Sequence, residues 1–259
     1  MLRYEEILAQ MGKSIAIYPL TVESIQGSSV DLLAGEYAWS TVTKKSVVIR
    51  SAEGNVVKIA PNDVVIVYSH EVVSVDSTIA GTIHSKIIWT THGIFMNSTN
   101  LDPGYTGNFM FTLYNRSNKE VLLQCGKTPI ATLVFYYIGG RTKFQMKAKT
   151  LQLRALNSID IVPDSSEAAD LDDQWRNSYE DVREKLKGSE EFSRLQAMKA
   201  SSPKAKLISV FKRWLIPAIL IAIIIIVYLS NLPESIKAAI PSVIALIALI
   251  KGSSIDKRR

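Results

Sequence analysis

The residues best suited to chemistry lie in two short segments. In Asn100-Leu-Asp-Pro-Gly-Tyr-Thr-Gly107, a turn fixed by Pro103 and Gly104 presents the carboxylate of Asp102. A carboxylate there could contact a sugar hydroxyl or orient a water molecule. In Ile25-Gln-Gly-Ser-Ser-Val-Asp-Leu32, the carboxylate of Asp31 offers the oxygen ligands that hard cations prefer. The alternative is that the two segments only shape a hairpin and a strand end.

Several other kinds of site are excluded or disfavoured. Cys125 is the only cysteine, which excludes an intrachain disulfide framework and a Cys-rich zinc centre of the kind that zinc deaminases use. The three histidines are scattered and do not predict a metal site. The formal net charge is +6, but eight of the 30 basic residues flank two hydrophobic runs near the C-terminus. We therefore expect no zinc and no nucleic-acid partner.

The remaining pattern predicts the elements that position these residues. Residues 2–11 have the spacing of a short helix that ends at Gly12. From Ile15 to about Tyr137, short β-branched runs alternate with turn residues, which predicts an all-β barrel or sandwich. Some of these runs are apolar at every position, as in strands covered on both faces inside an oligomer. Residues 165–200 predict an amphipathic helix, pausing at Gly188, that packs on the barrel or pairs with copies of itself.

The last fifth of the chain predicts a transmembrane helical hairpin. A charge-free run at 214–230 has about the length that spans a hydrocarbon core, and a shorter run follows at 236–250. Basic residues lie before the first run and after the second, whereas the connecting loop has none. The positive-inside bias then predicts a multi-pass membrane protein with its N-terminal domain and C-terminus in the cytoplasm. A buried hairpin of a soluble protein is the alternative.

The order of motifs resembles the dCTP deaminase and dUTPase superfamily over roughly residues 1–145. A helix is followed by Gly-x-x-Val-Asp, by Leu-Asp-Pro-Gly-Tyr-x-Gly and Leu-Tyr-Asn, and then by Gly126 and Leu-Val-Phe, as in the dCTP deaminase branch. The resemblance implies a mainly β, jelly-roll-like distorted barrel of the dUTPase type. It also implies homotrimers that bind a pyrimidine deoxynucleoside triphosphate with Mg²⁺ between subunits.

The resemblance assigns roles to five residues. Asp102 would contact the deoxyribose and, in an active enzyme, serve as the catalytic residue. Tyr105 would lie under the sugar, and Gly107 completes the same motif. Asp31 would act on Mg²⁺ indirectly, through metal-bound phosphates, and Lys86 matches a phosphate-binding arginine.

Departures from the family pattern fall on the chemistry. Ile87 and Ile88 match the serines of the phosphate motif, and isoleucine offers a phosphate no hydrogen bond. Thr112 stands where deaminases place a glutamate that moves protons, and Thr132 replaces a glutamine. Lys143-Phe-Gln145 is at most a remnant of the arm that closes over the phosphates.

These features predict three parts: a dCTP deaminase/dUTPase-like β domain (1–150), a charged helical linker (151–203) and a membrane hairpin (204–259). The favoured function is a membrane-tethered, catalytically degraded sensor or effector that binds a (deoxy)nucleotide at trimer interfaces. One alternative is an active, membrane-anchored dUTP pyrophosphatase or dCTP deaminase in pyrimidine deoxynucleotide metabolism. Another is a trimeric scaffold without a ligand.

Overall fold

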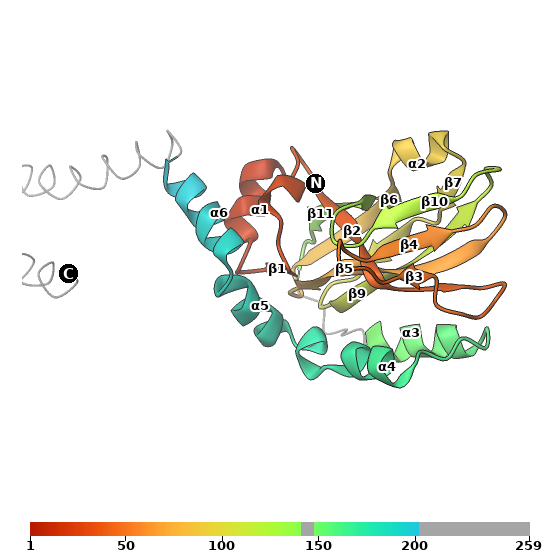
Figure 1. Ribbon diagram of the computed structural model, residues 1–259. Helices are drawn as coiled ribbons and strands as arrows, with labels where there is room; N and C mark the ends of the chain where they lie inside the picture. The colour runs from red at the N-terminus through yellow and green to blue at the C-terminus, as the bar shows by residue number, and fades with distance from the viewer. Residues whose placement is uncertain (141–147, 202–259) are drawn as a thin grey trace, which may run out of the picture. The chain divides into compact units, whose positions relative to one another are not determined.

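The computed structural model describes residues 1–140 and 148–201, and residues 1–197 form one compact unit. All paired strands are antiparallel, and they form two sheets that curl around a common core (Figure 1). The larger sheet has the order β7-β9-β5-β2-β11-β6-β8, with β1 paired to β5, and the smaller sheet has the order β10-β4-β3. The strands are β1 (Ile15–Tyr18), β2 (Val30–Ser40), β3 (Val48–Ile49), β4 (Val56–Ile59), β5 (Val64–Val75), β6 (Ile79–Ser85), β7 (Ile94–Met96), β8 (Thr99–Leu101), β9 (Thr106–Asn115), β10 (Val121–Gln124) and β11 (Pro129–Tyr137).

The helices precede, interrupt and follow the strands. They are α1 (Tyr4–Gln10), the 3-10 helix η1 (Val22–Ser24), α2 (Ile87–Thr91), α3 (Ala148–Asn157), α4 (Ser165–Asp172), the 3-10 helix η2 (Gln174–Asn177), α5 (Tyr179–Lys187) and α6 (Glu190–Ser201). The prediction of a mainly β fold with a short N-terminal helix is confirmed.

The two longest strands, β2 and β5, bend together at matching irregularities. The register shifts between Ala34 and Ala38 on β2, opposite residues near Ser69 on β5. Gly35 lies at this bend, where a Cβ atom would be 2.7 Å from the carbonyl oxygen of Tyr68. Only glycine allows the two backbones to approach so closely, and the bend helps to curl the sheet.

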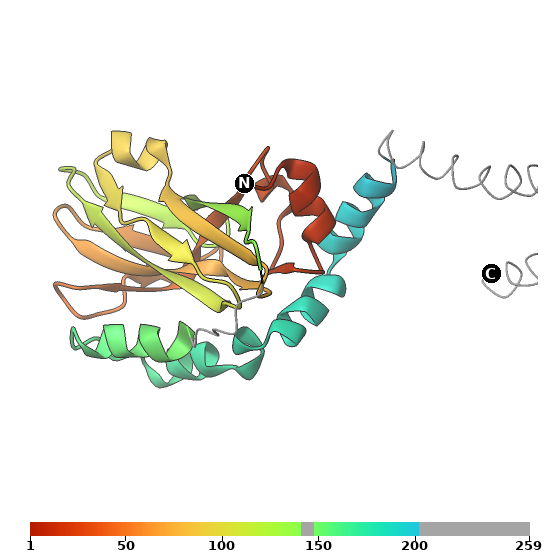
Figure 2. The same cartoon turned by 180° about the vertical axis from the view of Figure 1, so that it is seen from behind.

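The strands that are apolar at every position are covered on both faces by this one chain. One face of the sheet lines the main core, while Trp39, Ile66 and Tyr68 on the other face pack with Leu156 and Ile161. Figures 1 and 2 show α3 and α4 along this side of the sheet and α2 on the opposite side. Within one chain, the helical segment therefore supplies the cover that we had expected from an oligomer.

The helical segment differs in detail from the single helix predicted over 165–200. The pause at Gly188 is confirmed, since α5 ends at Lys187. A further break follows α4, where Asp173 has an extended conformation and η2 begins. Val182 and Leu186 of α5 are fully buried in the main core, so this part of the segment packs on the barrel.

In the ranges 1–140 and 148–201, no helix is long and apolar enough to cross a membrane. The predicted spans at 214–230 and 236–250 lie outside the described residues, as does Lys143-Phe-Gln145.

Candidate functional site

The turn that carries Asp102 connects β8 to β9. The carbonyl oxygen of Asp102 accepts a hydrogen bond from the amide of Tyr105 at 3.1 Å, and Gly104 has a φ of 76°. Proline at the second position and a positive φ at the third are typical of a type II turn. The amide of Gly104 also donates to the carbonyl oxygen of Asp76 at 3.1 Å, which fixes the turn to the end of β5. Local sequence therefore holds the Asp102 carboxylate at a partly exposed, defined position.

Tyr105 forms a fixed wall behind that carboxylate. Its ring stacks on Phe109 with 4.8 Å between centroids, and only 5% of the residue is exposed. Its hydroxyl donates to the carbonyl oxygen of Asn108 at 2.5 Å. Burial raises the pKa of Tyr105 far above the usual value, so the hydroxyl stays neutral.

Asp102 and Tyr105 line a groove with a volume of about 680 Å³, which we call the groove below. His84 and Thr82 on β6 face it as well, and His84 Nε2 lies 3.0 Å from Thr82 Oγ1. The groove has the size and mixed lining of a small-molecule site. Sequence reasoning discounted His84 as one of three scattered histidines. Its signal was the alternation along β6, which places Thr82 and His84 on one face.

Asp31 and Lys86 come together beside this groove. Lys86 Nζ lies 2.6 Å from Asp31 Oδ2, and Thr132 Oγ1 donates to Asp31 Oδ1 at 3.2 Å. Asp31 pairs with Thr132 across β2 and β11, and Thr132 pairs with His84 across β11 and β6. Cross-strand partners point to the same face of a sheet, so these groups form one polar row that ends at the groove.

The five residues assigned by resemblance therefore do not form one cluster within a chain. Asp102 and Tyr105 line the groove, and Asp31 and Lys86 form an ion pair in the adjoining row. Gly107 lines a different cavity, between the sheet and the helical segment.

The departures from the family pattern also have defined positions. Ile87 and Ile88 begin α2 and are 81% and 51% exposed. Thr112 is partly buried on β9, on the same face as Met110, which lines the groove. The two positions matched to phosphate-binding serines therefore carry exposed isoleucines, and the position matched to the proton-transferring glutamate carries the hydroxyl of Thr112.

Glu71 is a buried carboxyl group that the sequence did not single out. It is 3% exposed, and its oxygens accept hydrogen bonds from the amide of Leu33 at 3.0 and 3.3 Å. Burial raises the pKa of Glu71 from 4.5 to about 8, and the nearby charge of Asp31 adds to the shift. Its position in an otherwise apolar strand, flanked by His70 and Val72, was the available signal.

Across 1–140 and 148–201, no three His, Cys, Asp or Glu side chains gather in a way that could hold a metal ion. Both oxygens of Asp31 already have partners, so Asp31 would bind a cation directly only after Lys86 moved away.

The sequence profile of one family, described as dCTP deaminase-like, matches residues 1–138, more than half of the chain. The chain belongs to the dCTP deaminase-like family. The curled antiparallel sheet agrees with the mainly β fold predicted for this dCTP deaminase-like protein. The helical segment from Ala148 onward lies beyond the matched range.

Solved structures with a similar fold include the 2'-deoxycytidine 5'-triphosphate deaminase from Agrobacterium tumefaciens. It is 16% identical, with 63% of this chain and 54% of that chain aligned and a TM-score of 0.42. The dUTPase from phage phi11 of S. aureus is 12% identical over 52% of this chain and 97% of that one, with a TM-score of 0.35. The EIAV dUTPase is 17% identical over 53% and 94%, with a TM-score of 0.33. No curated protein matches the dCTP deaminase-like sequence.

Proposed function

We propose that this dCTP deaminase-like chain binds a pyrimidine deoxynucleotide without converting it, and that it acts as a sensor or effector. Family membership and the groove beside the Asp102 turn support the binding part. In this proposal Asp102 contacts the sugar and the fixed ring of Tyr105 excludes a 2'-hydroxyl.

The ion pair between Lys86 and Asp31 is the main support for the proposal that the chain does not catalyse a reaction. A phosphate needs hydrogen-bond donors and positive charge, and the charge of Lys86 is already matched at 2.6 Å by Asp31. The next two residues, Ile87 and Ile88, add no donor from their side chains. Thr112 has no pKa suited to moving a proton at neutral pH, so the face of β9 beside the groove lacks a general base there.

Mg²⁺ would accompany the phosphates in this proposal. A mutant of the dUTPase from phage phi11 of S. aureus coordinates a structural Mg(II) ion, which agrees with a role for this metal in related proteins. Here Asp31 fits only an indirect role, because its two oxygens are occupied by Lys86 and Thr132. We therefore assign no step of the mechanism to the metal.

Assembly and membrane attachment complete the proposal. We propose a homotrimer in which the exposed side chains of Ile87, Ile88 and Phe95 are covered by another copy, since exposed apolar patches mark interaction surfaces. We further propose that residues 204–259 tether the trimer to a bilayer, with the β domain and the C-terminus in the cytoplasm.

The test measures melting temperature and product together on the purified full-length protein with dUTP or dCTP and Mg²⁺. We expect a rise in melting temperature without dUMP, dUTP or pyrophosphate as products. Asp102→Asn should remove the rise, whereas Asp160→Asn, at an exposed turn position with a φ of 56°, should retain it.

Turnover that Asp102→Asn abolishes would instead establish an active dUTP pyrophosphatase or dCTP deaminase. An unchanged melting temperature with both dUTP and dCTP would support the alternative of a trimeric scaffold without a ligand. In that case the proposed binding function is wrong.

A further inference from the structure

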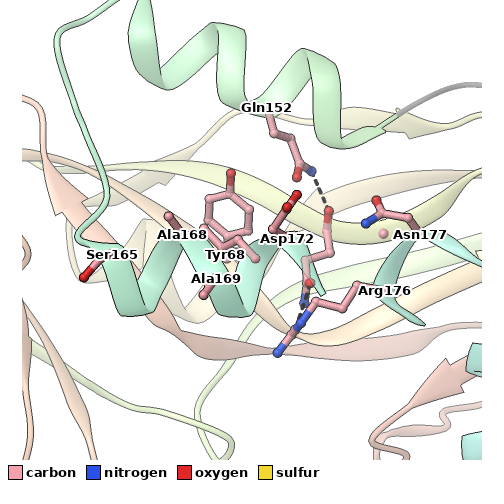
Figure 3. Close-up of a pocket in the computed structure, with 11 residues that line it drawn as sticks. Tyr68, Gln152, Ser165, Ala168, Ala169, Asp172, Arg176 and Asn177 are labelled. Carbon is pink, nitrogen blue, oxygen red and sulfur yellow. Dashed lines mark hydrogen bonds between the residues drawn. The ribbon is translucent and has the colours of Figure 1, made fainter. Parts of the chain in front are cut away.

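A second cavity lies between the outer face of the sheet and the helices that follow the barrel (Figure 3). Its volume is about 470 Å³, which is within the range of small-molecule sites. We call it the chamber. Side chains from both parts of the unit line it, including Tyr68, Asn108, Gln152, Ala168, Ala169 and Arg176.

Arg176 gives the chamber its positive charge. Its Nη1 donates to Asn108 Oδ1 at 3.1 Å, and the guanidinium lies over the rings of Trp175 and Tyr37, at 4.9 and 5.9 Å from their centroids. Its Nε is buried and has no hydrogen-bond partner. Within 1–140 and 148–201, no Asp or Glu side chain forms an ion pair with it.

Arg176 is partly exposed, but its Nε is buried and has no hydrogen-bond partner among the described residues. A buried donor without a partner costs free energy, and an anion at the guanidinium would supply that partner. Its planar set of donors fits the oxygens of a carboxylate or phosphate better than any other common group. Asp172 also lines the chamber, but it already takes part in another interaction.

The other walls of the chamber are apolar or internally hydrogen-bonded. Tyr68, Ala168 and Ala169 offer an apolar surface, and Figure 3 shows Gln152 extending into the chamber from the neighbouring helix. Gln152 Nε2 is used in a hydrogen bond of 2.5 Å to the carbonyl oxygen of Asn108. Arg176 therefore supplies the positive charge of the chamber, whose lining also includes the carboxylate of Asp172.

We propose that the chamber binds a small molecule that carries one anionic group, a phosphate or a carboxylate, on a planar or apolar body. The anionic group contacts the Arg176 guanidinium, and the body lies against Tyr68 and the two alanines of α4. This site is separate from the nucleotide groove and does not depend on the proposed function.

Ligand-observed saturation-transfer NMR on the purified full-length protein provides the test. Phenyl phosphate and benzoate are the two anionic probes, and phenol is the neutral control with the same ring. We expect both anions, or one of them, to bind in a saturable manner and phenol to bind at least about tenfold more weakly, because a charged hydrogen bond contributes that much. The better of the two anions then identifies the natural group as a phosphate or a carboxylate.

Four variants make the result specific. Arg176→Gln should weaken binding on the order of tenfold, and Ala169→Trp should do so by filling the chamber while keeping the charge. Arg183→Gln is the matched control, since its Nε is also buried without a hydrogen bond but it lies outside the chamber lining. Asp102→Asn should leave probe binding unchanged, so failure of the nucleotide proposal does not affect this test.

The proposal is overturned if neither anion binds, or if phenol binds as tightly as phenyl phosphate. It is also overturned if Arg183→Gln weakens binding as much as Arg176→Gln does. If Arg176→Gln does not fold, unchanged binding to Ala169→Trp alone is sufficient to reject the chamber as the site.

Discussion

The groove and the chamber are two cavities on the same sheet, and they differ in whether the nearby cation has a carboxylate partner. Beside the groove, the cation of Lys86 is matched by the carboxylate of Asp31 within the chain. At the chamber, the guanidinium of Arg176 has aromatic neighbours and an amide partner but no paired carboxylate in the described ranges. The groove lies beside a cation that the chain itself pairs, while the cation of the chamber has no ion-paired carboxylate in the described ranges.

This difference shows that the cavity inside the family-matched range and the cavity with an unpaired cation need not be the same. The groove is built by strands inside the matched range, and its turn geometry follows from local sequence. The chamber needs α3, α4 and η2, which lie beyond that range. A region added after the barrel can therefore create a new ligand site on a face that the barrel alone would expose to solvent.

The largest effect is expected from breaking the contact that holds the chamber together. Trp39 is 1% exposed, packs with Leu156, and donates from Nε1 to Glu167 Oε2 at 3.2 Å. Trp39→Ala should lower the free energy of unfolding by about 3–5 kcal/mol, the range for large buried aromatic residues. Chemical denaturation of the full-length protein measures this change. Trp39→Phe keeps an aromatic ring but removes the Nε1 donor, and it should cost less than half as much. Equal losses from the two variants would contradict a packing role.

A second large effect concerns pH and the buried carboxyl group behind the polar row. Because the folded pKa of Glu71 is raised from 4.5 to about 8, the folded state keeps a proton that the unfolded state releases. Stability is therefore full below about pH 4.5, falls as pH rises toward 8, and then levels off. Glu71→Gln should remove this fall, which amounts to a few kcal/mol.

Melting temperatures at pH 5, 6, 7 and 8 check the Glu71 prediction. The stabilisation by Glu71→Gln relative to the parent should grow steadily over this range. A constant difference between parent and Glu71→Gln would show that Glu71 is already ionised in the folded state.

Much of the barrel could be predicted from the sequence because its signals are local. Alternation in β9 and β11, the turn at Pro103 and Gly104, and the stop at Gly188 all depend on neighbouring residues. Helix α3 was predicted only as part of a helical linker that begins at residue 151, and the break at Asp173 was not predicted. The packing partners of these segments lie on β2 and β5, more than 80 residues earlier.

The candidate site divides in the same way. The Asp102 turn was predictable, but the pairing of Lys86 with Asp31 depends on β2, β11 and the end of β6 lying side by side. Sequence reasoning treated Lys86 as a remaining phosphate contact, and only the register of three strands brings its amino group to Asp31. Arg176 had no signal in the sequence, since its contacts combine its own segment with β2 and β9, far away along the chain.

A moderate effect is expected from the ion pair beside the groove, and it tests whether Lys86 stabilises the fold by pairing with Asp31. The ion pairs Lys86–Asp31 and Lys58–Glu120 share an N–O distance of 2.6 Å, but the first is largely buried and the second is more than 40% exposed on both sides. Lys86→Met should lower the free energy of unfolding by about 1–3 kcal/mol, because it leaves Asp31 with Thr132 alone. Lys58→Met should cost less than about 1 kcal/mol. Equal costs in urea denaturation would mean that burial does not strengthen the first pair.

The smallest effect is expected at Gln152, which lines both cavities. Its amide nitrogen donates to the carbonyl oxygen of Asn108 at 2.5 Å and lies 3.4 Å from the hydroxyl of Tyr105. Gln152→Ala should lower stability by only about 1 kcal/mol, since it removes one good hydrogen bond near solvent. If the two cavities are independent, the variant should change phenyl phosphate binding and nucleotide-induced melting shifts by less than about twofold. A larger change in both would show that Gln152 couples them, because the same side chain supports the ring of Tyr105 in the groove and the wall of the chamber.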